Sequence, residues 1–359
     1  MKKTLLALAA IAASSAAFAQ SSVTLYGVVD ASVESVKGAH TLTRVTSDNL
    51  STSRIGFKGT EDIGGGLKAN FALESALKVD TGAQGNTARF FDRQAWVGLT
   101  GGFGEVRLGR QDSPIGDIAR NVLVAQTYDD LKAVSTRAGV AYTRADNAIT
   151  YILPTVVPGL TASLQYSTAV GSSATGGAAG AENIGDAAYG ANSKAYGLGV
   201  KYVAGPVFAG VGYQYNTDEL VTAGKQKSNA TLGYAGYDFG VAKVTAYFDG
   251  ETSASHLTGL VAGARRMQVY GAKVAVPVAP QFTVIASGSV ARNVATSGNS
   301  ASDVQFLTVR ALYDLSKRTT VYAMFTNVNN DTASTLTFGD AVAAGKTSRG
   351  LAAGIKHTF

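Results

Sequence analysis

The side chains that most often carry catalysis or bind metal ions are few and scattered in this sequence. Among its 359 residues there is no cysteine, which excludes a disulfide framework and any cysteine-ligated metal. The three histidines, His40, His256 and His357, share no HExxH motif and no other metal-ligand spacing. Neither a metal centre nor a histidine-based catalytic triad is therefore predicted.

Glycine clusters offer no phosphate-binding loop either. Gly64-Gly65-Gly66 and Gly101-Gly102 do not match the spacing of a nucleotide-binding motif. Both are predicted to lie in tight turns, where a positive φ is reason enough for glycine. The sequence thus predicts no cofactor.

One stretch, residues 111–142, gathers charge in an unusual setting. The flanking sequence alternates apolar and polar residues, whereas this stretch does not (QDSPIGDIARNVLVAQTYDDLKAVSTRAGVAY). Its acids are Asp112, Asp117, Asp129 and Asp130, and its cations are Arg120, Lys132 and Arg137. Long connections of this kind tend to be functional. Two roles stay open for Asp129 and Asp130: they set an electric field for passing ions, or they only hold the segment in place.

The overall charge excludes one class of partner. The formal net charge is +6, but the lysines and arginines are dispersed and form no basic block. Nucleic-acid binding is therefore not predicted. Cationic groups that line a cavity would still favour anions.

The first twenty residues, MKKTLLALAAIAASSAAFAQ, have a basic start, an apolar middle and a small-residue end. This pattern predicts a secretory signal peptide, residues 1–19, that is cleaved before Gln20. No later stretch is long and apolar enough for a transmembrane helix. We expect an exported protein in which any membrane span is built from strands.

Alternation with a period of two is clear along the remaining chain. In 207–216, for example, Val207, Val211 and Tyr213 oppose Gln214 and Asn216. Such alternation predicts strands with one apolar and one wet face. Sixteen segments follow it: 22–35, 51–61, 66–79, 90–101, 104–111, 142–153, 159–170, 194–204, 206–217, 228–239, 240–251, 265–276, 280–293, 303–313, 318–328 and 349–359.

The connections between these segments alternate between short and long. Short turns at one end, long loops at the other and an even strand number are typical of an outer-membrane barrel. The predicted fold class is all-β: a sixteen-stranded antiparallel transmembrane β-barrel with short periplasmic turns and long external loops, residues 20–359. A soluble two-sheet sandwich would also alternate, but it is the weaker alternative, since it must bury all the apolar faces in a shared core.

Four stretches resemble a known family. They are SSVTLYGVVD (21–30), SRIGFKGTEDIGGGLKANFALE (53–74), RQAWVGLTGGFGEVRLGRQ (93–111) and GIKHTF (354–359). Together they are similar to the trimeric general diffusion porins of Gram-negative outer membranes, in the neisserial and betaproteobacterial branch. The resemblance implies a homotrimer in outer-membrane lipid whose third external loop, residues 111–141, folds inward as a constriction. The PEFGG signature of the best-known branch is absent from this loop.

The resemblance also implies functional residues, because arginines on the barrel wall of the family face acids on the inward loop. The matching wall positions are Arg54, Arg93 and Arg144, and the loop acids are Asp112, Asp117, Asp129 and Asp130. Alternation supports Arg54, since Ile55 and Phe57 would face lipid. It suits Arg93 less well, because Arg93 would point inward only if Gln94 faced outward. Lys58 and Arg107 are further inward candidates.

The predicted function is a water-filled channel for passive diffusion of small hydrophilic solutes and ions, and not an enzyme. Cations at least match acids around the predicted constriction, so a weak preference for anions is a hypothesis. A substrate-specific channel for sugars or carboxylates is an alternative. An outer-membrane barrel enzyme such as a lipase is a more remote one, because it would need a nucleophilic serine with a histidine near mid-barrel, and His357 near the end of the last predicted strand has no obvious acidic partner nearby.

Overall fold

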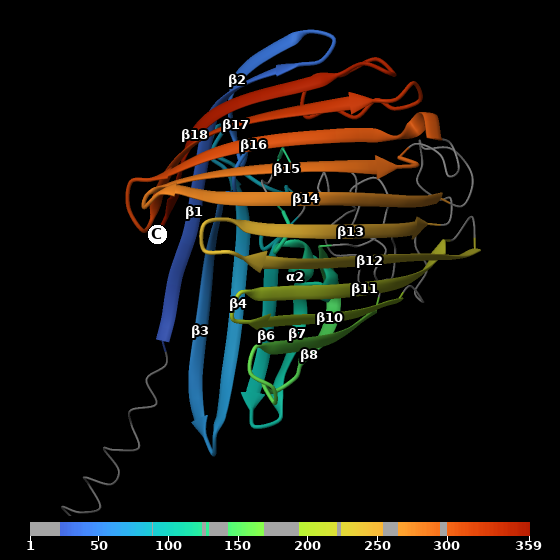
Figure 1. Cartoon of the computed structure of the whole chain (residues 1–359). Coiled ribbons are helices and arrows are strands. Elements are labelled where there is room, and N and C mark those ends of the chain that lie inside the picture. The colour runs from blue at the N-terminus through green and yellow to red at the C-terminus, as the bar shows by residue number, and fades with distance from the viewer. Residues whose placement is uncertain are drawn as a thin grey trace, which may run out of the picture.

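The chain forms a closed antiparallel β-barrel in the computed structural model (Figure 1). The structure describes residues 22–87, 89–123, 127–128, 143–168, 194–220, 224–253, 265–294 and 300–359. The first strand, β1 (Ser22–Lys37), pairs with the last, β18 (Ser348–Thr358). This pairing leaves the sheet without an open edge, and it confirms the predicted sixteen-stranded barrel.

The strand bounds follow the alternation in the sequence. Wall strands begin within four residues of the predicted starts. Between β1 and β18 they are β3 (Arg54–Gly64), β4 (Leu67–Lys78), β6 (Gln94–Gly101), β7 (Gly104–Asp112), β8 (Arg144–Ile152), β9 (Leu160–Thr168), β10 (Lys194–Ala204), β11 (Val207–Leu220), β12 (Gly224–Asp238), β13 (Lys243–Ser253), β14 (Arg265–Ala279), β15 (Phe282–Arg292), β16 (Val304–Asp314) and β17 (Thr319–Asn330).

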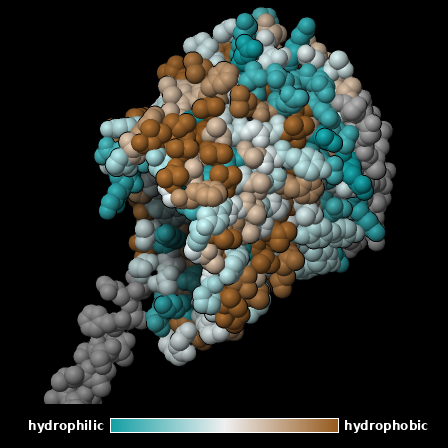
Figure 2. Space-filling model, in the orientation of Figure 1, coloured by the Kyte–Doolittle hydropathy of each residue, from teal (hydrophilic) through white to brown (hydrophobic). Residues whose placement is uncertain are grey.

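The two faces of the wall differ as predicted. On β1, Val23 and Leu25 are exposed on the outside, whereas Asp30 and Glu34 are buried within the barrel. On β11, Val211 is exposed and Gln214 is buried. Figure 2 shows brown, hydrophobic residues over much of the outer surface. The outer face is thus apolar, as contact with lipid requires.

Two short strands and one turn differ from the sequence-based expectation. The predicted loop 36–50 contains β2 (Thr41–Ser47), which pairs with the second half of β1, while β3 pairs with the first half. The loop 80–89 contains β5 (Ala83–Gln84), paired with the end of β4. In the β6–β7 turn the positive φ falls at Gly104 and not at Gly101-Gly102 as predicted, whereas Gly64-Gly65-Gly66 have positive φ as expected.

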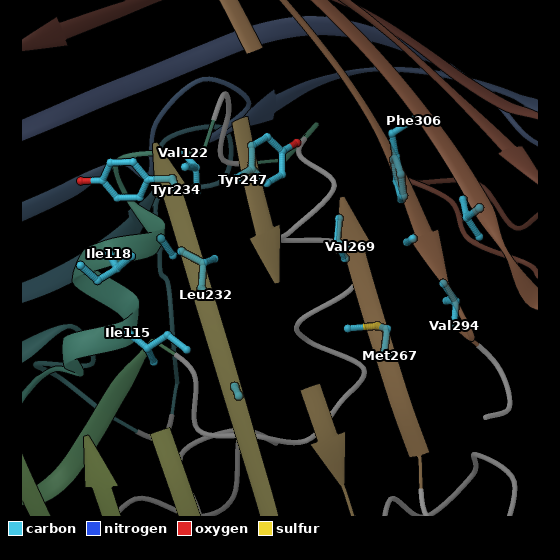
Figure 3. Close-up of a cluster of buried hydrophobic side chains, with 14 of the residues drawn as sticks. Ile115, Ile118, Val122, Leu232, Tyr234, Tyr247, Met267, Val269, Val294 and Phe306 are labelled. Atoms are coloured by element: carbon cyan, nitrogen blue, oxygen red, sulfur yellow. The ribbon is translucent and has the colours of Figure 1, made fainter. Parts of the chain in front are cut away.

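A short helix, α2 (Pro114–Ala119), follows β7 and packs against the inner wall. Ser113 caps it by accepting a hydrogen bond from the Gly116 amide at 3.0 Å, and Pro114 occupies the first turn, where no amide donor is needed. Ile115 and Ile118 of α2 belong to the same buried apolar cluster as Leu232 of β12 (Figure 3). Among the described residues, no helix has the length and apolar composition needed to cross a membrane.

An apolar cluster lines the inside of the barrel around this helix. It is made of fully or nearly buried side chains that include Ile115, Ile118, Val122, Leu232, Tyr234, Tyr247, Met267, Val269, Val294, Phe306 and Leu336 (Figure 3). The sequence analysis expected a wet inner face throughout. These inward apolar positions depart from that expectation because α2 and the external segments cover them.

Candidate functional site

The opposite inner wall, formed by β1, β3, β4, β6 and β7, surrounds a hollow of about 650 Å³. Five cationic side chains and two acidic ones line it. The cations are Arg54, Lys58, Arg93, Arg107 and Arg120, and the acids are Glu74 and Glu105. Four of these cations were predicted as wall residues, and the structure brings them together in one space.

Glu74 of β4 lies between two of the arginines. Its carboxylate is 2.5 Å from Nε of Arg93 and 3.5 Å from Nε of Arg54. Glu74 is almost fully buried, so water screens its ion pairs poorly. Glu74 was not among the residues predicted from the sequence to line the constriction. Its strand lies directly between the strands that carry or follow the two arginines, but the pairing depends on the strand register.

The arrangement at Arg93 corrects one expectation. Arg93 and Gln94 both line the hollow, although the alternation argument required Gln94 to face outward if Arg93 faced inward. β6 begins only at Gln94, so Arg93 precedes the strand and does not follow its alternation. Its backbone amide donates to the Glu74 carbonyl at 3.1 Å, which holds the turn against β4.

Arg107 and Lys58 extend the charged wall toward the periplasmic end. Arg107 makes a two-point ion pair with Glu105, at 2.8 and 2.9 Å, and its guanidinium stacks 4.2 Å from the Trp96 ring centroid. The ammonium of Lys58 lies 5.2 Å from the Tyr26 ring centroid. Aromatic faces attract cations, so both rings help to orient the charges.

Arg144 lies at the first position of β8, directly opposite Asp112 at the end of β7. Arg144 Nε is 3.2 Å from Asp112 Oδ1, and the same oxygen pairs with Arg120. Asp112 therefore lies between a wall arginine and a loop arginine. Arg144 does not line the hollow of Arg54 and Arg93, whereas Arg120 does.

The inner wall is shaped to seat α2. A Cβ at Gly199 would lie 3.0 Å from Pro114, and one at Gly212 only 2.8 Å from the Ile115 Cα. Glycine lets the helix approach the wall this closely. Asp117 forms an ion pair of 2.5 Å with Lys201 of β10, the strand that also carries Gly199, and this ion pair adds a second contact between the helix and that strand.

The same loop is held at a second point by Tyr128. Its hydroxyl donates to Glu34 of β1 at 2.7 Å, and its ring packs 5.4 Å from that of Phe338. Burial, together with this hydrogen bond, raises the pKa of Tyr128, so the hydroxyl stays a neutral donor. Asp129 and Asp130 lie outside the described residues, as do Lys132 and Arg137.

Phe338 belongs to the segment between β17 and β18, one of the predicted long external loops. Leu336 of this segment is buried in the apolar cluster, and the ring centroid of Phe338 lies 6.3 Å from that of Phe306. Asn330 fixes the turn with its side chain, which accepts from the Leu336 amide at 2.7 Å and donates to the Leu336 carbonyl at 2.9 Å. This segment therefore lies across the inside of the barrel mouth.

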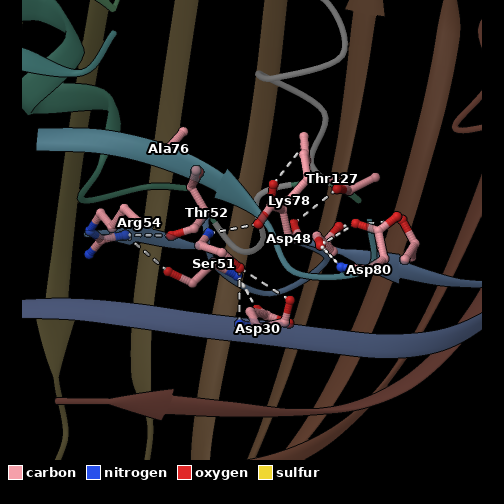
Figure 4. Close-up of polar contacts among 12 residues, drawn as sticks. Asp30, Asp48, Ser51, Thr52, Arg54, Ala76, Lys78, Asp80 and Thr127 are labelled. Carbon is pink, nitrogen blue, oxygen red and sulfur yellow. Dashed lines mark hydrogen bonds and ion pairs between the residues drawn. The ribbon is translucent and has the colours of Figure 1, made fainter. Parts of the chain in front are cut away.

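A polar network joins the loop to the segment that precedes Arg54 (Figure 4). Asp30 accepts from the Ser51 amide at 2.6 Å, and Arg54 donates to the Thr52 carbonyl at 2.9 Å. Thr127 of the loop donates to the Asp48 carbonyl at 3.0 Å. Loop and wall are therefore positioned together, and Arg54 is held where it enters the hollow.

An exported barrel with an apolar outer face, a loop folded inside and a charged hollow defines an outer-membrane channel. The sequence profile of the Gram-negative porins matches residues 5–333. The chain is 33% identical to outer membrane porin protein 32 of Delftia acidovorans, over the full length of both proteins. Over 34% of its length it is 40% identical to major outer membrane protein P.IB of Neisseria gonorrhoeae, of which the match covers 35%.

Solved structures agree with the sequence relatives. The anion-selective porin from Comamonas acidovorans superposes with a TM-score of 0.80 at 28% identity, covering 95% of this chain and all of that one. This chain belongs to the Gram-negative porin family. It is an outer-membrane porin that forms a channel for passive diffusion of small hydrophilic solutes.

Proposed function

We propose that the hollow is the selective constriction of the channel and that it favours anions. The residues that we assign to its wall are Arg54, Arg93, Lys58 and Arg107. Arg144 does not line the hollow, but it forms an ion pair with Asp112, which also pairs with the lining residue Arg120. The observation that carries the proposal is the excess of cations over acids among the side chains that line the hollow. One relative of known structure is an anion-selective porin, which is consistent with this assignment.

The physical argument rests on shared counter-charges. Arg54 and Arg93 share one carboxylate, that of Glu74, so the three groups together remain positive. Rings of charged side chains set the selectivity of pores by stabilising one sign of ion in transit. Guanidinium groups also present paired donors that match carboxylates and phosphates. Small carboxylate and phosphate solutes are therefore the anions that fit best.

We propose the following organisation for the mature protein. Residues 1–19 form a signal peptide that is removed, residues 20–359 form the barrel, and residues 111–141 form the constriction loop. Asp112 and Asp117 tie that loop to cations, which supports an anchoring role for both. The assembly is a homotrimer in outer-membrane lipid, with no nucleic-acid partner. The channel acts by diffusion without enzymatic chemistry.

The double variant Arg54→Gln/Arg93→Gln tests the proposal in planar bilayers. We expect the wild type to give a reversal potential of anion-selective sign in a salt gradient, and the variant to move it toward cation selectivity. The matched control is Lys317→Gln/Arg318→Gln, which removes the same charge from an exposed periplasmic turn. Cation selectivity of the wild type, or equal shifts in variant and control, would contradict the proposal.

A channel specific for carboxylates is the second candidate. The paired arginines around Glu74, with Tyr26 and Trp96 on the same wall, could hold one carboxylate solute. Flux of that solute would then saturate with concentration, whereas general diffusion stays proportional to it. Solute-uptake rates in vesicles, measured over a wide concentration range, separate the two.

A further inference from the structure

Toward its periplasmic end, the charged hollow contains a small recess whose floor is Ala72 of β4. The strand register places Ala72 opposite Lys58 of β3 on one side and opposite Trp96 of β6 on the other. All three residues line the hollow. Neighbouring strands lie about 4.8 Å apart, so the backbones at Lys58 and Trp96 are about 10 Å apart across a single methyl group. This spacing leaves room for one flat ring, which makes contacts at about 3.5–4.0 Å on each face.

Two aromatic side chains border this recess. The Tyr26 ring lies against the backbone of β3 at Gly56, where an added Cβ would be 2.6 Å from its Cζ. The Trp96 indole is oriented by its own strand, since its Nε1 donates to Gln94 Oε1 at 2.8 Å. Trp96 is the single tryptophan of the sequence, and it lines the hollow, whereas tryptophans of membrane proteins gather at the interfaces with water. Both rings are therefore in contact with the path of the solutes.

Lys58 provides the positive charge of the recess. Its side chain is exposed, and no ion pair joins it to an acid in the part of the chain that the structure describes. The two acids of the hollow, Glu74 and Glu105, are by contrast already paired with arginines. The ammonium of Lys58 lies 5.2 Å from the Tyr26 ring centroid, so charge and ring occupy the same side of the recess. The charge of Lys58 is therefore open to the carboxylate of a solute.

We propose that this recess, named here the aromatic-acid recess (Tyr26, Lys58, Ala72 and Trp96), is a subsite for small aromatic carboxylates such as benzoate. The carboxylate pairs with the Lys58 ammonium, and the ring lies over Ala72 between Tyr26 and Trp96. Lysine donates charge-assisted hydrogen bonds to carboxylates, and aromatic pairs stabilise one another beyond the apolar area that they bury. The inference rests on the anion-selective channel proposed above and adds the class of anion that it retains.

The experiment compares benzoate with cyclohexanecarboxylate, which has the same charge and a similar size but no aromatic face. Each acid is added to wild-type channels in planar bilayers at constant chloride, and its dissociation constant is obtained from the concentration dependence of the ion-current block. We expect benzoate to bind about fivefold more tightly than cyclohexanecarboxylate. Because Trp96 is the single tryptophan, quenching of its fluorescence by benzoate gives a second readout that does not depend on conduction.

Three variants separate the contributions of ring, space and charge. Trp96→Leu should remove the preference for benzoate, and Ala72→Leu, which fills the recess without changing its charge, should remove it as well. Lys58→Gln should weaken the binding of both acids by the same factor, about fivefold. The matched control for this charge is Lys68→Gln, since Lys68 lies at the periplasmic end of β4 and does not line the hollow. It should bind both acids as the wild type does.

Two results would overturn the proposal. The first is equal affinity of the wild type for benzoate and cyclohexanecarboxylate, and this comparison needs no variant to fold. The second is a preference for benzoate that persists in both Trp96→Leu and Ala72→Leu, which would place the aromatic contact elsewhere in the channel. The reversal potential in a chloride gradient, measured on the same channels, keeps the two proposals apart. Anion selectivity with no preference for benzoate would refute the recess alone, whereas cation selectivity would refute the proposed function.

Discussion

The two halves of the inner wall differ in the chemistry of their inward side chains. On β3, β4, β6 and β7 the inward positions include charged side chains such as Arg54, Glu74 and Arg107, which border an open hollow. On β12, β14 and β16 the inward positions include Leu232, Met267 and Phe306, which are apolar and buried. The same alternation produces both halves. They differ in what lies over them, since α2 and the segment that carries Leu336 cover only the apolar half.

This difference shows how a water-filled barrel holds a loop inside itself. Burying a side chain such as Ile118 is worth about 1.5–3 kcal/mol, which offsets the cost of ordering the loop. Covering the charged half in the same way would desolvate arginines at a cost of several kcal/mol each. The loop is therefore anchored where the wall is apolar, and the charged wall stays accessible to solutes.

The largest expected effect comes from placing a charge in the apolar half. Ile118→Asp puts an unpaired carboxylate in a cluster where Ile118 is 1% exposed, which costs several kcal/mol. We expect the loop to leave the wall, which would raise single-channel conductance and open residues 113–123 to protease. Asn121→Asp is the matched control, because it adds the same charge to an exposed position of the loop. Equal conductance in the two variants would contradict the anchoring argument.

A smaller change tests the close seating of α2. Gly212→Ala would place a Cβ 2.8 Å from the Ile115 backbone, so the helix must shift at a cost of about 1–3 kcal/mol. Gly233→Ala on β12 serves as the control, since the nearest atom to its Cβ is 3.8 Å away. We expect only the first variant to change the conductance and its fluctuations. If Gly212→Ala left the conductance and its fluctuations unchanged, the close contact between Gly212 and Ile115 would not be needed to position the helix.

The charged half is tested by removing an acid from it. Glu74→Gln leaves Arg54 and Arg93 without their shared partner, so the anion preference should increase. A unit charge about 10 Å from a passing ion changes its energy by about 1.7 kcal/mol at an effective dielectric constant of about 20, before salt screens it. The measurement is the reversal potential at low and high ionic strength. A shift toward cations would show that Glu74 does not oppose the field of the arginines.

The smallest expected effect is at the end of α2, on the apolar half of the wall. Lys273 of β14 donates to the carbonyls of Asn121 and Val122, at 3.2 and 3.1 Å, just beyond α2. Lys273→Met keeps the length of the side chain but removes these hydrogen bonds, at a cost of about 1 kcal/mol. We expect a modest fall in the temperature at which conductance becomes unstable. Gln at the same position, which can still donate, should restore part of it.

Much of the fold was predictable because strands and turns follow local rules. Period-two alternation located the wall strands, and the inward direction of Arg54 followed from its neighbours Ile55 and Phe57. The alternation argument was wrong about Gln94, because Arg93 precedes β6 and its direction is not tied to that of Gln94. Alternation also gave no indication that Leu336 is buried, since its burial depends on a surface made by distant strands.

The sequence by itself determined which face each strand residue occupies, because backbone geometry sets that within a few residues. It also specified a barrel that closes on itself, through the number of strands and the alternation of short and long connections. Only the tertiary structure decided which inward residues meet. Strand register makes Glu74 the ion-pair partner of Arg54 and Arg93. The placement of the loop brings α2 into the same apolar cluster as Leu232. These contacts join residues far apart along the chain, and no local pattern encodes them.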